Sequence, residues 1–170
     1  MEDALGRIIA GVFGVLVLFY LPIMALSIKQ EHTSQTYVDN AVQEFVDNAR
    51  AAGKISDDAY ENMLYQIDKV VAGCKVEIEH QSKYAVADEN GKVETYYFTN
   101  TKDEILEYIY TPSGENRDYA IQNGDFLKVT VYNEIPTFAT RIYRIIMPNY
   151  NPNNTSIYFT YSGYVGNNIE

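Results

Sequence analysis

Residues 8–28 read IIAGVFGVLVLFYLPIMALSI, a run of 21 residues without a single charge. As an α-helix that rises 1.5 Å per residue, this run is about 30 Å long, which matches the hydrocarbon thickness of a bilayer. The core helix of a soluble protein normally keeps a polar stripe, and this run has none. The sequence therefore predicts one transmembrane helix over residues 8–28.

A cleaved secretory signal peptide is the alternative interpretation, because Ala25 and Ser27 are small enough to form a cleavage site. The apolar run is too long for a signal peptide, however, and Glu2 and Asp3 stand where such peptides carry basic residues. We therefore expect a retained anchor that follows a short head, residues 1–7.

Composition limits the functions that the rest of the chain can have. The 170 residues include 13 basic and 23 acidic side chains, for a net charge of −10. This excess of acid leaves no basic stripe for phosphates, so we expect no nucleic-acid partner. The single cysteine, Cys74, excludes an intramolecular disulfide framework. Arg7 and Lys29 flank the span evenly, but few basic residues and 16 tyrosines favour a cell-membrane protein with an extracytoplasmic body.

Helical periodicity continues directly after the predicted span. Apolar residues recur at steps of three and four: Val38, Ala41, Val42, Phe45, Ala49 and Ala52. No Gly or Pro lies between Ile28 and Val38, so the span and its continuation are expected to form one rod that ends before Gly53. A second helix, capped by Ser56 and closed by Gly73, is expected to fold back as an antiparallel hairpin and to complete a helical region over residues 29–73.

The remaining residues, 74–170, alternate between strand and helix signals and predict an α+β body with an antiparallel sheet. The predicted elements are a strand from Cys74, a hairpin around Asn90-Gly91, a helix capped by Thr101 and Glu104, a strand over 126–132, a helix after Pro136 with strand as its alternative, and a strand over 157–165.

Nothing in this body indicates an active site, a metal centre or a cofactor. His80 follows Glu79, but adjacent strand residues point to opposite faces, so His80 is expected at a solvated strand end rather than in a metal site or proton relay. Cys74 lacks a histidine that would activate it and is expected to be a buried small hydrophobe. The triplet Asn153-Asn154-Thr155 matches a glycosylation acceptor. We therefore predict a protein that is not an enzyme and has no small-molecule substrate.

The layout resembles that of pilins and pseudopilins, in which an apolar helix anchors the subunit before assembly and packs in a helical bundle afterwards. The chain is most similar to minor pilin-like proteins of tight-adherence (Tad, type IVc) loci of Firmicutes. The similarity lies in five segments: MEDALGRIIA (1–10), QTYVDNAVQEFVDNARAAGKISDDAYENML (35–64), VEIEH (76–80), GDFLKVTVYN (124–133) and SGYVGN (162–167).

The resemblance implies a non-enzymatic accessory subunit of a Tad-like pilus or secretion apparatus, whose partners are the bilayer and other subunits. Gly6 is the possible processing site, although Gly11 stands where prepilins carry a glutamate, which favours a minor role over that of a major pilin. The residues expected to pack against neighbouring helices are Gly11, Gly14, Val38, Val42, Phe45 and Ala49.

A membrane-tethered binding or sensor module is the competing hypothesis. Tyrosine gives contact area at a low cost in conformational entropy, and several tyrosines fall on predicted strands, where they are also ordinary sheet residues. The tyrosines expected on such a recognition surface are Tyr96, Tyr97, Tyr158, Tyr161 and Tyr164.

Overall fold

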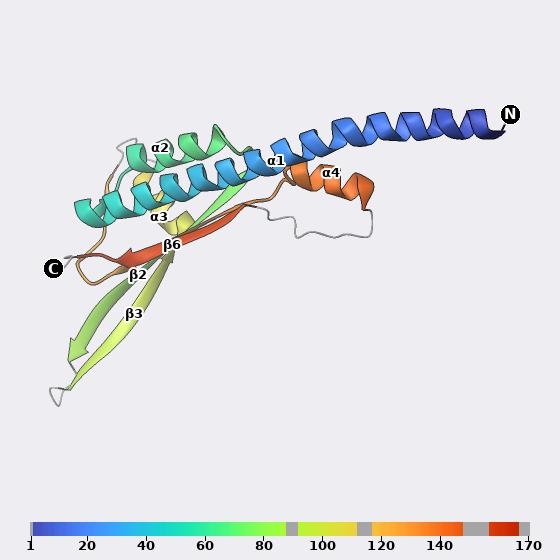
Figure 1. The fold of residues 1–170 in the computed structure, drawn as a ribbon. Coiled ribbons are helices and arrows are strands. Elements are labelled where there is room, and N and C mark those ends of the chain that lie inside the picture. The colour runs from blue at the N-terminus through green and yellow to red at the C-terminus, as the bar shows by residue number, and fades with distance from the viewer. Residues whose placement is uncertain (1, 88–91, 112–116, 148–156, 167–170) are drawn as a thin grey trace.

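A single helix, α1 (Glu2–Ala52), forms the long axis of the molecule (Figure 1). The computed structural model describes residues 2–87, 92–111, 117–147 and 157–166. The expected rod is confirmed, because the helix passes through Pro22 without a break and ends before Gly53, whose φ of 67° stops it. The apolar run and the amphipathic run are thus one continuous element.

The two halves of α1 have opposite surroundings. Residues 4–23, here called the uncovered half, are exposed apart from the half-buried Tyr20, and Leu18 keeps 68% of its surface. From Met24 onward the body covers one face of the helix, and Val38 and Val42 are fully buried. The apolar half therefore projects from a folded body that does not enclose it (Figure 1).

Helix α2 (Asp57–Asp68) folds back along the covered half of α1. The Ser56 hydroxyl accepts a hydrogen bond from the Ala59 amide at 3.3 Å, as an N-cap does. Phe45 and Tyr60 meet edge to face across the hairpin, with ring centroids 6.4 Å apart. The antiparallel hairpin is confirmed, but the helix ends at Asp68; Gly73, with φ of 75°, lies in the later turn into the sheet.

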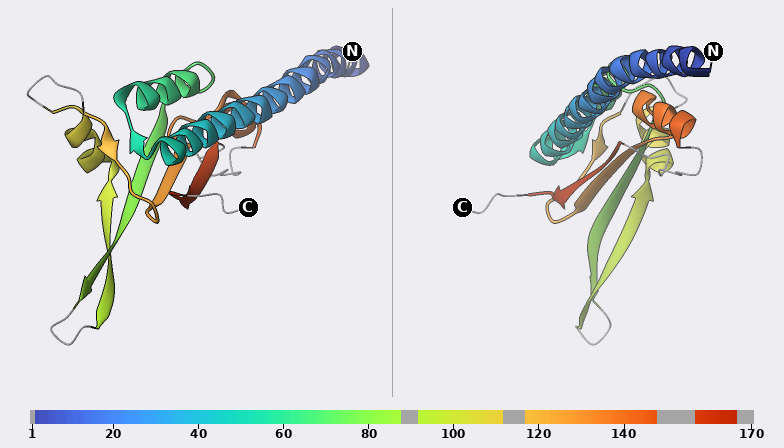
Figure 2. Two further views of the ribbon diagram at one scale, coloured as in Figure 1. Left: turned by 90° about the vertical axis from the view of Figure 1, so that its left-hand side faces the viewer. Right: turned by 45° about the vertical axis from the view of Figure 1, so that its right-hand side comes forward.

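Four antiparallel strands form the main sheet, in the order β3-β2-β5-β6. Their bounds are Cys74–Ala87 for β2, Val93–Thr101 for β3, Phe126–Asn133 for β5 and Tyr158–Tyr164 for β6. A separate pair, β1 (Lys54–Ile55) with β4 (Tyr119–Ala120), was not predicted because two-residue strands leave no periodicity. The α+β class is confirmed, and α1 and α2 cover one side of the sheet (Figure 2).

Alternation places the core residues of the central strands where the sequence predicts them. On β5, Leu127, Val129 and Val131 are fully buried, and on β2, Val76 and Ile78 face the same core. This alternation, joined to the apolar face of α1, accounts for the main core.

The two remaining helices are also confirmed. In α3 (Lys102–Ile109), Thr101 and Glu104 form the expected capping box, and the backbone amide of Thr101 lowers the pKa of the Glu104 carboxyl. The segment after Pro136 forms helix α4 (Phe138–Ile146), as predicted, and not the alternative strand. Thr137, rather than Pro136, provides its N-cap.

The outer part of the β2–β3 hairpin projects from the body with both faces exposed (Figure 2). Tyr84 and Tyr96 stack across the two strands at 5.6 Å, and Tyr97 points to the opposite face with 61% of its surface exposed. Pairing of Ala87 with Val93 confirms the hairpin. Its expected turn at Asn90-Gly91 and the triplet Asn153-Asn154-Thr155 lie outside the described residues.

Candidate functional site

The uncovered half of α1 is the most prominent surface of the molecule. The helix that carries it is long and apolar enough to cross a membrane. Soluble proteins rarely expose an apolar patch of more than a few hundred Å², and larger patches mark membrane or protein contacts. Its large exposed side chains are Leu5, Ile8, Ile9, Val12, Phe13, Val15, Leu16, Val17, Leu18, Phe19, Leu21 and Ile23.

Gly6, Gly11 and Gly14 lie on this uncovered half. Apart from the helix's own backbone, no atom of the described residues would come within 4 Å of a Cβ atom placed on any of the three. They therefore have no packing role inside the described part of the chain. Small residues on a membrane helix let a second helix approach closely, so Gly11 and Gly14 stay candidates for intermolecular packing.

The other four residues expected to pack against neighbouring helices lie buried within the chain itself. Val38, Val42, Phe45 and Ala49 are each at most 4% exposed, because they pack inside the chain's own core. An amphipathic pattern predicts which face of a helix is covered, but it does not say whether the cover comes from the same chain. These residues hold the body on the rod and are not available to a neighbouring helix.

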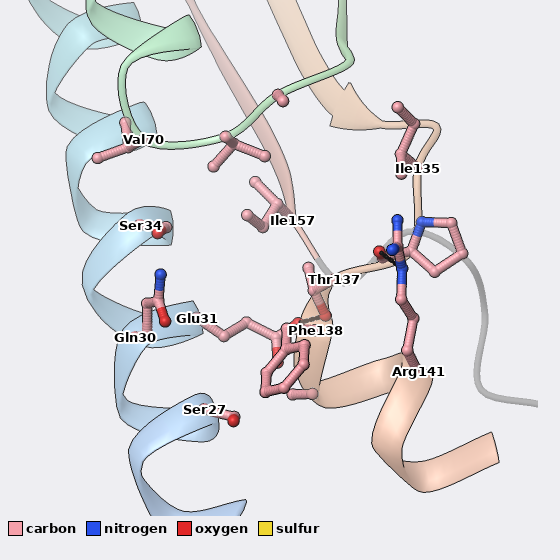
Figure 3. A pocket seen from close by; sticks show the side chains of 14 residues that line it. Ser27, Gln30, Glu31, Ser34, Val70, Ile135, Thr137, Phe138, Arg141 and Ile157 are labelled. Carbon is pink, nitrogen blue, oxygen red and sulfur yellow. Dashed lines mark hydrogen bonds between the residues drawn. The ribbon is translucent and has the colours of Figure 1, made fainter. Parts of the chain in front are cut away.

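A groove lies where the body meets the uncovered half of α1 (Figure 3). It encloses about 290 Å³ between α1, α4, the turn after α2 and the residues that precede α4. On one wall, the Thr137 hydroxyl donates to the Glu31 carboxylate at 3.0 Å and ties the start of α4 to α1. Ser27 and Ser34 face the groove from α1, and Phe138 and Arg141 line it from α4.

Helix α4 presents an apolar surface to solvent on the side away from α1. Its buried residues are Ala139 and Thr140, and its largest exposed side chain is Ile145, with 78% of its surface accessible. Phe138, Ile146 and Met147 are exposed as well. The helical spacing was predicted from the sequence, but the outward direction of this apolar face was not.

His80 lies in a buried polar cluster, which corrects the expected solvated strand end. The residue sits in the middle of β2, only 2% exposed, while Glu79 points to the opposite, exposed face. Its Nε2 atom lies 3.0 Å from Asp125 Oδ2 and its Nδ1 atom 2.8 Å from the Tyr119 hydroxyl. Asp125 is 4% exposed and comes from the turn before β5.

The cluster forms a continuous chain of hydrogen bonds. A carboxylate only accepts, so a proton on His80 Nε2 points at Asp125, and Nδ1, when it carries no proton, accepts from the Tyr119 hydroxyl. The Tyr119 oxygen in turn accepts from the Asn100 amide at 2.7 Å. Asp125 also receives the backbone amides of Lys83 and Gln122, at 3.2 and 2.8 Å.

This cluster joins β2, β3, β4 and the turn before β5. Burial, assisted by the negative charge of Asp125, raises the pKa of the Tyr119 hydroxyl, which therefore stays protonated and donates. The imidazole and carboxylate are both shielded from solvent and already have partners. Among the described residues, no group of three or more His, Cys, Asp and Glu side chains is placed to hold a metal ion.

Cys74 is a half-buried free thiol. Burial, with the nearby charge of Asp68, raises its pKa to about 11. A raised pKa keeps the nucleophilic thiolate scarce at neutral pH.

We expect Cys74 in the folded chain to react with iodoacetamide at pH 8 at least roughly tenfold more slowly than in chain unfolded by urea. The rate should still rise as pH increases above 9, because the thiolate forms only as pH approaches the raised pKa. Mass spectrometry of the alkylated protein measures both rates, and equal rates in the two states would contradict the assignment.

Comparison with known proteins adds no relative to these observations. No protein-family model, curated protein or solved structure matches the chain. Functional conclusions therefore rest on the geometry of the uncovered helix, the groove at its base and the exposed surfaces of the body.

Proposed function

We propose that this protein is a non-enzymatic, membrane-anchored accessory subunit of pilin-like type, with its body outside the cytoplasm. One observation carries the proposal: a single helix is apolar and uncovered over its first half and built into the core of a folded body over its second half. This arrangement suits a subunit that is held first by lipid and later by the helices of its neighbours.

The physical basis is the contrast between the two halves of α1. An uncovered apolar helix is unfavourable in water and favourable in a bilayer, where it needs no cover from its own chain. The rigid continuation into the core fixes the body relative to the anchor, because no loop separates them. A change in the packing of the anchor is thereby passed to the body as a rigid movement.

Neighbouring subunits would then contact the uncovered half of α1 and the outer surface of the body. The covered face of α1 beyond Met24 is already occupied by α2, β5 and β6, so that face cannot also receive a neighbour. Gly11 and Gly14 are the positions at which a second helix can approach most closely. A Tad-like pilus or secretion apparatus is the kind of assembly that uses such contacts.

Replacing Gly14 with leucine is expected to weaken association of the protein in membranes roughly fivefold or more, equivalent to about 1 kcal/mol, because the larger side chain separates the packed helices. The measurement is chemical crosslinking of the full chain in native membranes. Leu16→Phe, which enlarges a side chain on the other side of the helix, is the matched control and should crosslink like the unmodified protein. Unchanged crosslinking of the Gly14→Leu variant would contradict the proposed packing.

A tethered binding module is the second candidate, favoured by the projecting β2–β3 hairpin. Tyr96, Tyr97, Tyr158 and Tyr164 are exposed, whereas Tyr161 is half-buried and packs against the core. A receptor that uses this surface would bind its ligand as a fragment lacking residues 1–28. An assembly subunit would lose its interactions when the same residues are removed, so this deletion separates the two candidates.

A further inference from the structure

We propose that α4 is a second membrane contact, which inserts its apolar outer face into the bilayer surface beside α1. The inference rests on the proposed anchoring of α1 and adds to it a lipid-binding element within the body. The consequence is that α1 and the body fixed to it take one tilt and one rotation relative to the bilayer.

The position of α4 supports this contact. The Thr137 hydroxyl, at the start of α4, donates a hydrogen bond to Glu31, and Ala139 and Ser27 line the same groove. From there α4 runs back along α1 toward its N-terminus, away from the sheet (Figures 1 and 3). Its C-terminal end therefore lies beside the apolar part of α1, at the level where the bilayer surface would be.

The outward surface of α4 has the chemistry of an interfacial helix. Its exposed apolar side chains are Ile145, Ile146 and the adjoining Met147, while Phe138, which is also exposed, lines the groove. Arg141 and Arg144 give the helix a positive charge, with Arg141 Nε donating to the Pro136 carbonyl at 3.1 Å, and the helix contains no acidic residue. Long basic side chains beside an apolar face can reach lipid headgroups while their stems stay in apolar surroundings. In a chain of net charge −10, this basic element is exceptional.

A lipid surface fits this face better than a second protein does. Two apolar side chains on this nine-residue helix and the adjoining Met147 expose on the order of a few hundred Å², below the roughly 800 Å² per partner of a stable interface. The helix is about 14 Å long, so it is too short to cross a bilayer and suits its surface. Helix α4 runs beside the N-terminal half of α1 in Figure 1, so one bilayer can cover the exposed apolar side chains of both helices.

The absence of tryptophan from the sequence allows a direct test in the full chain. The variant Ile145→Trp, placed in phosphatidylcholine vesicles with bromine on the shallow part of the acyl chains, reports contact with lipid by fluorescence quenching. Phe13→Trp places the probe in the uncovered half of α1, and Tyr97→Trp places it on the projecting hairpin. We expect quenching of Ile145→Trp to exceed that of Tyr97→Trp roughly threefold or more.

The three variants separate the possible failures. If Phe13→Trp is quenched and Ile145→Trp is quenched no more than Tyr97→Trp, the contact of α4 with lipid is overturned and the anchor stands. If Phe13→Trp is not quenched, the proposed anchoring itself fails. If Ile145→Trp emits at short wavelength without quenching, protein rather than lipid covers α4, and the inference is overturned in favour of a second copy.

Discussion

Replacing both Val15 and Leu18 with aspartate is expected to remove the full chain from the membrane fraction. Both side chains lie in the uncovered half of α1, 56% and 68% exposed, and neither has a role in the core of the body. A charged residue at the centre of a membrane helix costs about 2.5–3.5 kcal/mol on insertion scales, so two cost about 5–7 kcal/mol. Extraction of membranes with alkaline carbonate measures the loss.

The matched control adds the same charges to exposed positions of the body. Tyr96 and Tyr97 are exposed on β3, so the variant with aspartate at both should remain in the membrane pellet. Retention of the Val15→Asp/Leu18→Asp variant in the pellet would show that something other than the uncovered half of α1 holds the protein there.

Removing the Asp125 carboxylate is expected to destabilise the body by about 3 kcal/mol or more. In the variant Asp125→Ala, His80 Nε2 loses its acceptor in a buried place, and the backbone amides of Lys83 and Gln122 lose theirs in a partly buried one. Denaturant unfolding of the full chain in detergent, followed through loss of sheet signal, measures the free energy of unfolding.

Asp118→Ala is the control for this substitution, because Asp118 also accepts a bond from a basic side chain, Lys54, at 2.6 Å. That pair is about half exposed, so its loss should cost only about 0–1 kcal/mol. Equal effects of the two substitutions would mean that the buried cluster does not hold the strands together as described.

The elements of the fold follow from local patterns in the sequence. The uncharged run, the amphipathic continuation and the stop at Gly53 predict α1 because each signal lies within a few helical turns. The capping box at Thr101 and the alternation on β5 are equally local. Strand pairing around Asn90-Gly91 was predictable because a hairpin joins neighbours in the chain.

The buried cluster depends on contacts between distant residues, and no local signal reveals it. His80, Tyr119 and Asp125 meet only after β2 pairs with β5 and the short β4 is placed beside them. His80 looked like the end of a strand because the apolar alternation stops near Ile78, yet β2 continues to Ala87. The alternation of apolar and polar residues cannot predict that a polar strand residue is buried when its hydrogen-bond partners come from distant parts of the chain.

The periodicity of an amphipathic helix likewise does not predict what packs against its apolar face. Phe45 and Ala49 were correctly placed on the covered face of α1, but the body of the same chain covers them. On α4 the apolar spacing was clear, and part of that face remains open to solvent. The arrangement of the whole body is needed to tell which apolar faces are left for lipid or for other proteins.

The central claim is that the chain stays anchored by residues 8–28 with its body outside the cytoplasm. The most direct test expresses the full chain with a C-terminal tag in a Gram-positive host, treats intact cells with protease, and reads the mature N-terminus by mass spectrometry. We predict that the tag is digested from outside and that the apolar run is retained, with at most the first six residues removed. Protection of the tag in intact cells, or a new N-terminus near Ile28, would contradict the account.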